Sequence, residues 1–308
     1  MDTVLLEHRS DSGAPVLPRG AKRPQVMPCS ADAVGAAGLS AVFLATPPEV
    51  SMELTPGFLQ AGAKVIDLSG AFRLRTAENY KHWYKADHGA PELFSEAAYG
   101  LPEVCRERIK GAQLVSNPGC YPTAANLAIR PLVQAALIDR NAGIVCDAKS
   151  GVSGAGRKAS LKTSFCEVAE NFSAYSLFDH RHVPEVLLNS GLEESEFTFV
   201  AQLIPIDRGI LETIYFRGTP GTTTESIMSA YDSAYRDAPF VRTYDPGVMP
   251  DLHAVQRTNF CDIGVKYDAA TRRGVIVAVI DNLGKGAAGQ AVQNMNLVLG
   301  FAEQEGLI

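Results

Sequence analysis

The sequence contains no cysteine pattern typical of a metal site and no long hydrophobic segment. Its six cysteines include no C-x-x-C pair and none close to a histidine, so we expect neither a zinc site nor a disulfide framework. No apolar run approaches the roughly 18 residues that a membrane-spanning helix requires. The first residues carry an acid at position 2 and no stretch of signal-peptide character. These absences predict a cytoplasmic protein with reduced thiols, no bound metal and no membrane partner.

Long runs of basic residues are also absent, although the chain is well supplied with charge. It has 28 lysines and arginines against 34 aspartates and glutamates, which gives a formal net charge of −6. A nucleic-acid-binding surface needs clustered basic residues, so we expect no nucleic-acid partner. The chain has 308 residues, 46% of them hydrophobic, and this suits two domains or one large α/β domain.

The first half of the chain alternates short apolar runs with segments of helical character. A helix is expected over residues 48–63, interrupted near Pro56, and another over residues 121–137, kinked at Pro131. The alternation favours a doubly wound parallel sheet. The runs typical of buried strands cover residues 39–50, 64–72 and 112–117.

Apolar and polar residues partly alternate along the strand-like runs of the second half. This pattern indicates a mixed or antiparallel sheet, so the predicted fold class is α/β with an α+β second region. One helix is expected over about 223–237 and another over 287–304. The strand-like runs cover residues 143–151, 197–206, 210–218, 260–268 and 274–282.

The segment VSNPGCYPTAANLA, residues 115–128, places Cys120 at the start of a predicted helix. Pro122 suits the first turn of a helix because the N–H that it lacks has no partner there. Free N–H groups and the positive end of the helix dipole favour the thiolate of Cys120 and lower its pKa. The residues alone leave two interpretations open, a nucleophile at the carboxyl edge of a sheet or a small cysteine packed in a tight turn.

A nucleophilic cysteine needs a base, and DHRHVPE, residues 179–185, offers His180 and His182. Two residues at i and i+2 of an extended segment point to opposite faces, so we expect one of the two histidines to reach Cys120. The alternative is a polar surface loop. His82 and His88 are weaker candidates.

Two glycine-rich segments follow predicted strands. KSGVSGAGRK, residues 149–158, has a backbone that could cradle phosphate or lie under a flat cofactor ring, or it could be a simple turn. GKGAAG, residues 284–289, matches G-x-G-x-x-G, but no strand with an acidic residue can follow it before Ile308. We therefore reject GKGAAG as a dinucleotide loop and expect its glycines to allow close helix packing.

Several motifs, in consistent order from about Ser40 to the C-terminus, resemble those of N-acetyl-γ-glutamyl-phosphate reductases, NADPH-dependent enzymes of arginine biosynthesis. The resemblance implies a Rossmann-like NADP domain at residues 1–119 plus 283–308. It also implies a catalytic and oligomerisation domain of the glyceraldehyde-3-phosphate-dehydrogenase type at residues 120–282, in a homo-oligomer. The motifs are VIDLSGAFRL, WYKADHGAPEL, YGLPEV, SNPGCYPTA, KSGVSGAGRK, HRHVPE, PIDRGI and DNLGKGAAGQAVQNMN.

The same resemblance implies that Cys120 attacks an acyl-phosphate substrate and forms a thioester, with His180 or His182 moving the proton. NADP(H) is the implied cofactor, with its 2′-phosphate recognised by Arg9 in HRSDSG. Arg157 and Arg208 are implied to bind the substrate phosphate or carboxylate. The other implied cofactor contacts are Thr46, Pro47, Ser150, Gly151, Ser153, Gly154 and Asn282.

The chain departs from the family pattern at its start. The family begins with a strand and a loop resembling G-x-T/S-G-Y-x-G, whereas this chain starts near the second strand, TVLLEHRS. The first strand is central in such sheets, so we expect TVLL to lack a neighbour and strand edges to be exposed. Without a helix N-terminus for the pyrophosphate, weak NADPH binding is expected.

Other functions stay open on the residues alone. The same chemistry could act on N-acetyl-aminoadipyl phosphate of lysine biosynthesis, because a pocket distinguishes one methylene by only about 1–3 kcal/mol. A cofactor-free cysteine hydrolase would also use Cys120 and a histidine. A shortened chain with little activity could still assemble with full-length subunits.

Overall fold

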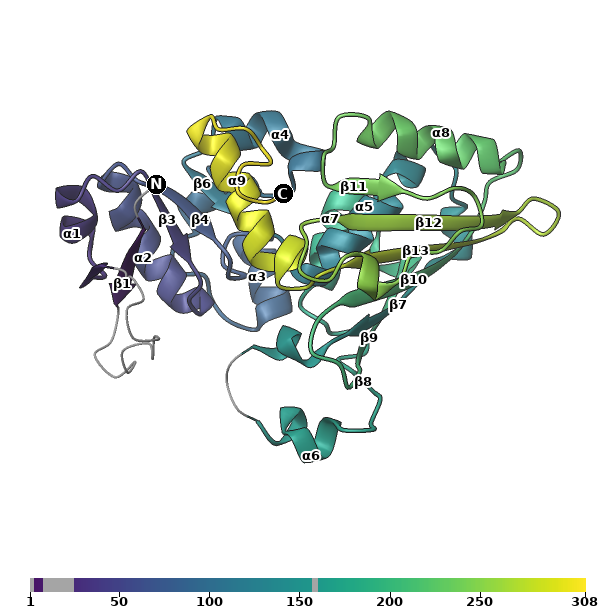
Figure 1. The fold of residues 1–308 in the computed structure, drawn as a ribbon, viewed down its shortest axis with the longest axis horizontal. Helices are drawn as coiled ribbons and strands as arrows, with labels where there is room; N and C mark the ends of the chain where they lie inside the picture. The colour runs from purple at the N-terminus through teal and green to yellow at the C-terminus, as the bar shows by residue number, and fades with distance from the viewer. Residues whose placement is uncertain (1–2, 8–24, 157–159) are drawn as a thin grey trace.

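The computed structural model describes residues 3–7, 25–156 and 160–308 of the chain. It has an N-terminal region with two small parallel sheets and a C-terminal region built on one larger sheet (Figure 1). The C-terminal helix returns from the large sheet to pack on the N-terminal region. No helix among these residues is long and apolar enough to cross a membrane. The fold class is therefore α/β, as predicted.

The N-terminal region contains a four-stranded and a two-stranded parallel sheet. The four-stranded sheet has the order β3-β4-β6-β5, and its short strands are largely buried, as expected for a parallel sheet covered by helices. The strands are β1 (Val4–Glu7), β2 (Gln25–Pro28), β3 (Ala41–Leu44), β4 (Lys64–Asp67), β5 (Ala98–Tyr99) and β6 (Leu114–Ser116). The helices are α1 (Ala31–Ala36), α2 (Pro48–Gln60), α3 (Ala77–Tyr84) and α4 (Pro102–Lys110).

Two expectations for this region need correction. Strand β1 does have a neighbour, because it pairs in parallel with β2 from Val4 opposite Gln25 onward. Its other edge is unpaired among the described residues, since β1 and β3 belong to different sheets. Helix α2 is not interrupted at Pro56 but continues through it to Gln60. It lacks one backbone hydrogen bond there, because proline has no N–H to donate.

The C-terminal region is built on a seven-stranded mixed sheet of order β11-β12-β13-β10-β7-β9-β8. Most neighbours are antiparallel, but the pairs β7–β9 and β11–β12 are parallel, which agrees with the predicted mixed sheet. Its strands are β7 (Ile144–Ser150), β8 (Ser173–Tyr175), β9 (Phe197–Leu203), β10 (Ile210–Arg217), β11 (Val241–Thr243), β12 (Cys261–Asp268) and β13 (Arg273–Ile280).

One face of this sheet is covered by helices. Helix α5 (Cys120–Gln134) packs against β10, β12 and β13, and it contacts α7 (Val183–Ser190) and α8 (Thr224–Tyr235) (Figure 1). Residues of β9 alternate between buried and half-buried, as a half-covered sheet requires. The opposite face leaves Val145 39% and Tyr215 45% exposed. Helix α5 is thus the central element that carries the predicted nucleophile.

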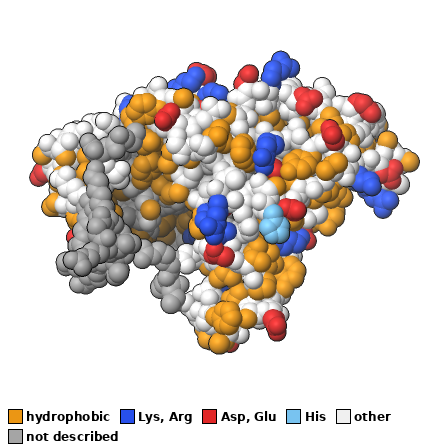
Figure 2. Space-filling view, viewed as in Figure 1, with side chains coloured by type: hydrophobic (Ala, Val, Ile, Leu, Met, Phe, Trp, Pro, Cys, Tyr) orange, Lys and Arg blue, Asp and Glu red, His pale blue; other side chains and the backbone are white. Residues whose placement is uncertain are grey.

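A lobe formed by residues 152–156 and 160–178 projects from the edge of the large sheet (Figure 1). It includes the 3-10 helices η3 (Val152–Ala155) and η4 (Leu161–Thr163), helix α6 (Phe165–Val168) and strand β8. Hydrophobic side chains gather on this projection in Figure 2. The other 3-10 helices are η1 (Pro91–Phe94), η2 (Arg140–Ala142), η5 (Glu194–Glu196) and η6 (Leu252–Ala254).

Near the C-terminus, the π-helix η7 (Gly284–Ala288) is followed directly by α9 (Gly289–Leu299), and together they form the return segment. Helix α9 packs on α4 and β4 of the N-terminal region. A fully buried ion pair, Lys285 Nζ to Glu103 Oε1 at 2.7 Å, fixes this return segment to α4. The return segment therefore connects the two regions next to the candidate site.

Candidate active site

Cys120 is the first residue of α5, immediately after β6 and the turn at residues 117–119. Gly119 occupies the N-cap with extended backbone angles, and Pro122 lies in the first helical turn. The prediction of a thiol at a helix N-terminus, beyond the carboxyl end of a parallel strand, is confirmed. A cavity of about 500 Å³ opens beside Cys120, and its lining includes Ser150 and Gly154.

Both candidate histidines line this cavity and are buried, with 8% of His180 and 7% of His182 exposed. The expectation that they point to opposite faces is wrong, because His182 is not extended but has helical backbone angles at the N-cap of α7. The backbone N–H of His182 donates to Nδ1 of His180 at 3.2 Å, and the ring centroids lie 4.9 Å apart. A Cβ on Gly119 would stand 2.5 Å from Nε2 of His182. His182 therefore lies directly beside the turn that carries Cys120.

Glu185 is a site residue that the sequence reasoning missed. Its fully buried carboxylate accepts hydrogen bonds from the backbone N–H of Gly119 at 2.9 Å and the Tyr99 hydroxyl at 3.1 Å. Arg73 donates to its other oxygen at 3.2 Å, and Nε2 of His182 lies 4.0 Å from that oxygen. The available signal was a glutamate three positions after His182. Its partners, far away in the sequence, carry no local signal.

The protonation of the site is set by burial. Desolvation raises the pKa of the Cys120 thiol to about 11, although the backbone N–H of Tyr121 favours the thiolate. The expected lowering of this pKa is therefore wrong, because loss of water outweighs the helix terminus. Desolvation also lowers the pKa of His180 to about 4 and that of His182 well below its ordinary value. At neutral pH the site thus contains a thiol beside two uncharged imidazoles.

The residues expected near the cofactor ring come together from three segments. Asn282, after β13, donates from Nδ2 to the Ser153 hydroxyl at 3.0 Å and accepts from the Gly209 N–H at 2.7 Å. A Cβ on Gly154 would stand 2.8 Å from Oγ of Ser150, and one on Gly151 would stand 2.6 Å from the Asp207 carbonyl oxygen. These glycines thus allow a compact loop beside Cys120.

Thr46 and Pro47 follow the carboxyl end of β3. They therefore lie at the same edge of the parallel sheet as the carboxyl end of β6, which leads to Cys120. Thr46 exchanges a hydrogen bond with the Ser51 hydroxyl at 2.8 Å, and Pro47 is the N-cap of α2. Neither lines the cavity at Cys120. The predicted residues Arg9 and Arg157 lie outside the described residues.

Arg208 is not among the residues that line the cavity, and its contact with substrate stays a prediction. Its guanidinium is paired at 3.1 Å with Asp281, whose carboxylate is fully buried. Asp281 also accepts hydrogen bonds from the N–H groups of Leu283 and Gly284 at 2.8 and 3.0 Å. Arg208 therefore supports the loop that leads into η7.

The GKGAAG segment forms η7 and the start of α9 and does not follow the course of a dinucleotide loop. A Cβ on Gly286 would stand 2.8 Å from Cβ of Cys120, and one on Gly289 would stand 2.3 Å from Oδ1 of Asn259. The prediction that these glycines allow close packing is confirmed. π-Helical turns are rare and occur often at functional sites, and this one lies against the candidate nucleophile.

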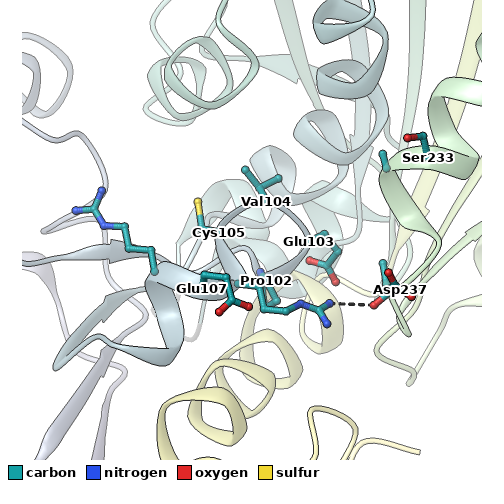
Figure 3. Close-up of a pocket in the computed structure, with 11 residues that line it drawn as sticks. Pro102, Glu103, Val104, Cys105, Glu107, Ser233 and Asp237 are labelled. Carbon is teal, nitrogen blue, oxygen red and sulfur yellow. Dashed lines mark hydrogen bonds between the residues drawn. The ribbon is translucent and has the colours of Figure 1, made fainter.

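A second cavity, of about 590 Å³, lies between α4 and the end of α8 and contains none of the predicted site residues (Figure 3). Figure 3 shows Glu103 and Asp237 on its opposite sides. Arg106 donates to the Asp237 carbonyl oxygen at 3.1 Å and pairs with Glu303 at 3.0 Å. Because Arg106 and Glu103 already have partners, we regard this cavity as part of the contact between the two regions.

Comparison with known proteins gives two family matches along the chain. Residues 4–112 match the NAD binding domain of semialdehyde dehydrogenases, and residues 120–282 match their dimerisation domain. The chain is 46% identical over 299 residues to an N-acetyl-gamma-glutamyl-phosphate reductase of Symbiobacterium thermophilum, covering 96% of this chain and 86% of that protein. It is 49% identical over 270 residues to the enzyme of that name from a Geobacillus species, covering 87% of this chain and 78% of the relative.

Solved structures support the fold. Aspartate semialdehyde dehydrogenase II of Vibrio cholerae, complexed with ASA, superposes with a TM-score of 0.71 at 18% identity, covering 97% of this chain and 90% of that chain. An aspartate semialdehyde dehydrogenase of Candida albicans, solved with NADP, gives a TM-score of 0.65 at 15% identity, covering 94% and 85%. At these identities the likeness concerns the fold alone.

Proposed function

The chain belongs to the N-acetyl-γ-glutamyl-phosphate reductase family, and from this premise we propose that it reduces N-acetyl-γ-glutamyl phosphate to N-acetylglutamate semialdehyde with NADPH. One observation carries the proposal: Cys120 begins α5 beside a cavity that two uncharged histidines also line. A nucleophile next to a neutral base is what attack on an acyl phosphate requires.

In the first step, Cys120 Sγ attacks the acyl carbonyl carbon while an imidazole accepts the thiol proton. We assign this base to His182, because its Nε2 lies beside the Gly119 turn. The C–O bond to phosphate then breaks, the imidazolium returns the proton to the leaving phosphate, and a thioester remains on Cys120. Because burial raises the pKa of the resting thiol, the attack needs the neutral imidazole as the general base that accepts the proton.

The residues beside Cys120 fit a flat nicotinamide ring, because the backbone at Gly154 is free of a Cβ and faces the same cavity as the thiol. Ser153 and Asn282 provide polar groups there, and we propose Thr46 and Pro47 for the adenine half of the cofactor. When bound, NADPH supplies the hydride that reduces the thioester. The histidine then takes up a proton from solvent and delivers it to sulfur as the C–S bond breaks and the aldehyde leaves, which restores the Cys120 thiol.

Glu185 and Arg73 position the nucleophile and do not touch substrate in this proposal. Glu185 holds the Gly119 N–H, and Arg73 from the N-terminal region neutralises the carboxylate. Because the Gly119 N–H already donates to Glu185, the Tyr121 N–H is the backbone donor that stabilises the developing charge on Cys120.

We further propose the domain division predicted from the sequence, with residues 1–119 and 283–308 for the cofactor and 120–282 for catalysis and assembly. The packing of α9 on α4 supports the first grouping. The half-exposed outer face of the large sheet, including Val145 and Tyr215, suits contact with a second copy. The cytoplasmic location expected from the sequence stays a prediction.

Phosphate-dependent reduction of NADP with N-acetylglutamate semialdehyde tests the function in the reverse direction. We expect turnover by the wild-type chain and loss of at least about a thousandfold in Cys120→Ala, because the thioester cannot form. Full activity of Cys120→Ala would refute the mechanism. A higher kcat/KM on the semialdehyde longer by one methylene would favour the aminoadipyl substrate instead.

A further inference from the structure

We propose that Lys162 binds the α-carboxylate of the substrate, at the side of the active-site cavity that faces the projecting lobe. The proposal rests on the function proposed above, which requires a substrate with two anionic groups. One is the acyl phosphate, which must lie at Cys120. The other is the carboxylate at the opposite end of the carbon chain, for which neither Cys120 nor the histidines offer a partner.

Lys162 has the position for this role. It belongs to η4 of the lobe, lines the main cavity with Cys120, and also lines an adjoining pocket of about 70 Å³ under α6. It therefore stands where the cavity meets the lobe. The cavity of about 500 Å³ is within the usual size range of small-molecule sites.

The lysine is held in place by an aromatic ring. Its Nζ lies 4.7 Å from the centroid of Tyr175, a geometry in which the ring face attracts the ammonium. The Tyr175 hydroxyl lies 3.1 Å from that of Tyr121, the residue after Cys120. Two phenol rings thus lie between the lysine and the nucleophile along the cavity wall, which separates the ammonium from the reacting end.

The charge of Lys162 is not matched by the protein. Among the described residues, no carboxylate forms an ion pair with Lys162. Of the two cations predicted for the substrate phosphate or carboxylate, Arg208 is paired with Asp281, and Arg157 lies outside the described residues. An unpaired ammonium at the wall of a substrate cavity is suited to bind a carboxylate.

The second cation of the cavity wall is assigned to the other end of the substrate. Arg181 lies between the two histidines in sequence, lines the same cavity, and its charge lowers the pKa of both rings. It is therefore close to the reacting groups, where the phosphate must bind. Of the two cations that line the cavity among the described residues, this leaves Lys162 for the carboxylate.

The reverse reaction separates the two anions, because phosphate and N-acetylglutamate semialdehyde are then independent substrates. We expect Lys162→Met to raise KM for the semialdehyde about tenfold and to leave KM for phosphate and kcat within about twofold. Lys162→Arg should restore most of the affinity, because it keeps the charge. Lys110→Met is the matched control, since Lys110 pairs with Glu107 on the surface of α4.

An analogue with a neutral α-carboxamide completes the test. The wild type should bind it as weakly as Lys162→Met binds the semialdehyde, and Lys162→Met should bind it no worse than the wild type does. A raised KM for phosphate in Lys162→Met, or unchanged KM values for both substrates, would overturn the proposal.

Calorimetric titration of the semialdehyde into wild type and Lys162→Met measures binding affinity directly, so it tests the inference without requiring turnover. If the wild type is inactive but binds the semialdehyde more tightly than the variant, the proposed function fails and the carboxylate site stands. If the two bind equally, the carboxylate site fails whether or not the wild type is active. No binding by the wild type refutes both.

Discussion

The two regions of the molecule differ in how many strands their sheets contain and in how long those strands are. The C-terminal region has one continuous sheet of seven strands, several of them seven or eight residues long. Within the described residues, the N-terminal region divides its strands between two sheets, and none of these strands is longer than four residues. Its strands also leave Leu5, Val26 and Phe43 between 41% and 51% exposed. The nucleophile is thus anchored in the more extensively paired region.

This difference shows where the geometry of the site is determined. The sheet under α5 supports the histidines and the serine-glycine loop, whereas Cys120 also follows directly from β6 of the N-terminal region. The N-terminal region reaches the site through a few buried polar contacts, chiefly Arg73 to Glu185 and Glu103 to Lys285. We therefore expect substitutions in these contacts to uncouple the two regions.

The largest loss of stability is expected from Glu185→Gln, which breaks the ion pair between the two regions beside the nucleophile. It removes the carboxylate that pairs with the buried Arg73 guanidinium, so the free energy of unfolding should fall by about 3–5 kcal/mol. Chemical denaturation with kcat/KM measurements would check this. Glu196→Gln, which breaks the more exposed pair with Arg140, should cost less than about 1 kcal/mol. Equal losses in the two variants would contradict the prediction.

A smaller effect, confined to the C-terminal region, is expected from pH. The folded state keeps His180 neutral until its pKa of about 4, whereas an unfolded histidine accepts a proton near 6.5. The stability that this group contributes is therefore complete above pH 6.5 and falls by up to about 3 kcal/mol as pH drops toward 4. Urea denaturation between pH 7 and pH 4.5 should show a shallower decline in His180→Gln. His253→Gln, at an exposed position, should follow the wild type.

The smallest effect is expected from Gly286→Ala, which tests the contact between the return segment and the nucleophile. The new Cβ would stand 2.8 Å from Cβ of Cys120, so one of the two segments must shift at a cost of about 1–3 kcal/mol. We expect kcat to fall more than stability, because Cys120 itself is displaced. Gly111→Ala, with no atom within 4 Å of its new Cβ, is the control. Unchanged kcat in Gly286→Ala would show that the contact is unimportant.

The features predicted correctly from the sequence are those set by local pattern. Turn residues and Pro122 located the start of α5, and apolar runs located most of the strands, although not the short strands β2, β5, β8 and β11. The rejection of GKGAAG as a dinucleotide loop rested on chain length alone, and the glycines indeed serve packing. Cys120 could be placed at a helix terminus because the residues that determine this position are its immediate neighbours in the chain.

The features missed depend on residues that are distant in the sequence. The pKa of Cys120 is raised by burial under several segments, which no local pattern reports. Glu185 gains its role from Arg73, Tyr99 and Gly119, and the two histidines share one cavity because a helix begins at His182. The ion pair of Arg208 could not be predicted from local pattern, because its partner Asp281 lies 73 positions away.

The raised pKa of Cys120 also determines the chemical durability of the resting protein. Because burial raises this pKa to about 11, the thiol form predominates at pH 7, whereas the thiolate is the form that reacts readily with peroxide or alkylating agents. The sulfur is thus shielded from oxidative damage until a carbonyl carbon is in place to receive it. An alkylating reagent would meet the exposed Cys166 of the lobe before it modified the thiol that performs the chemistry.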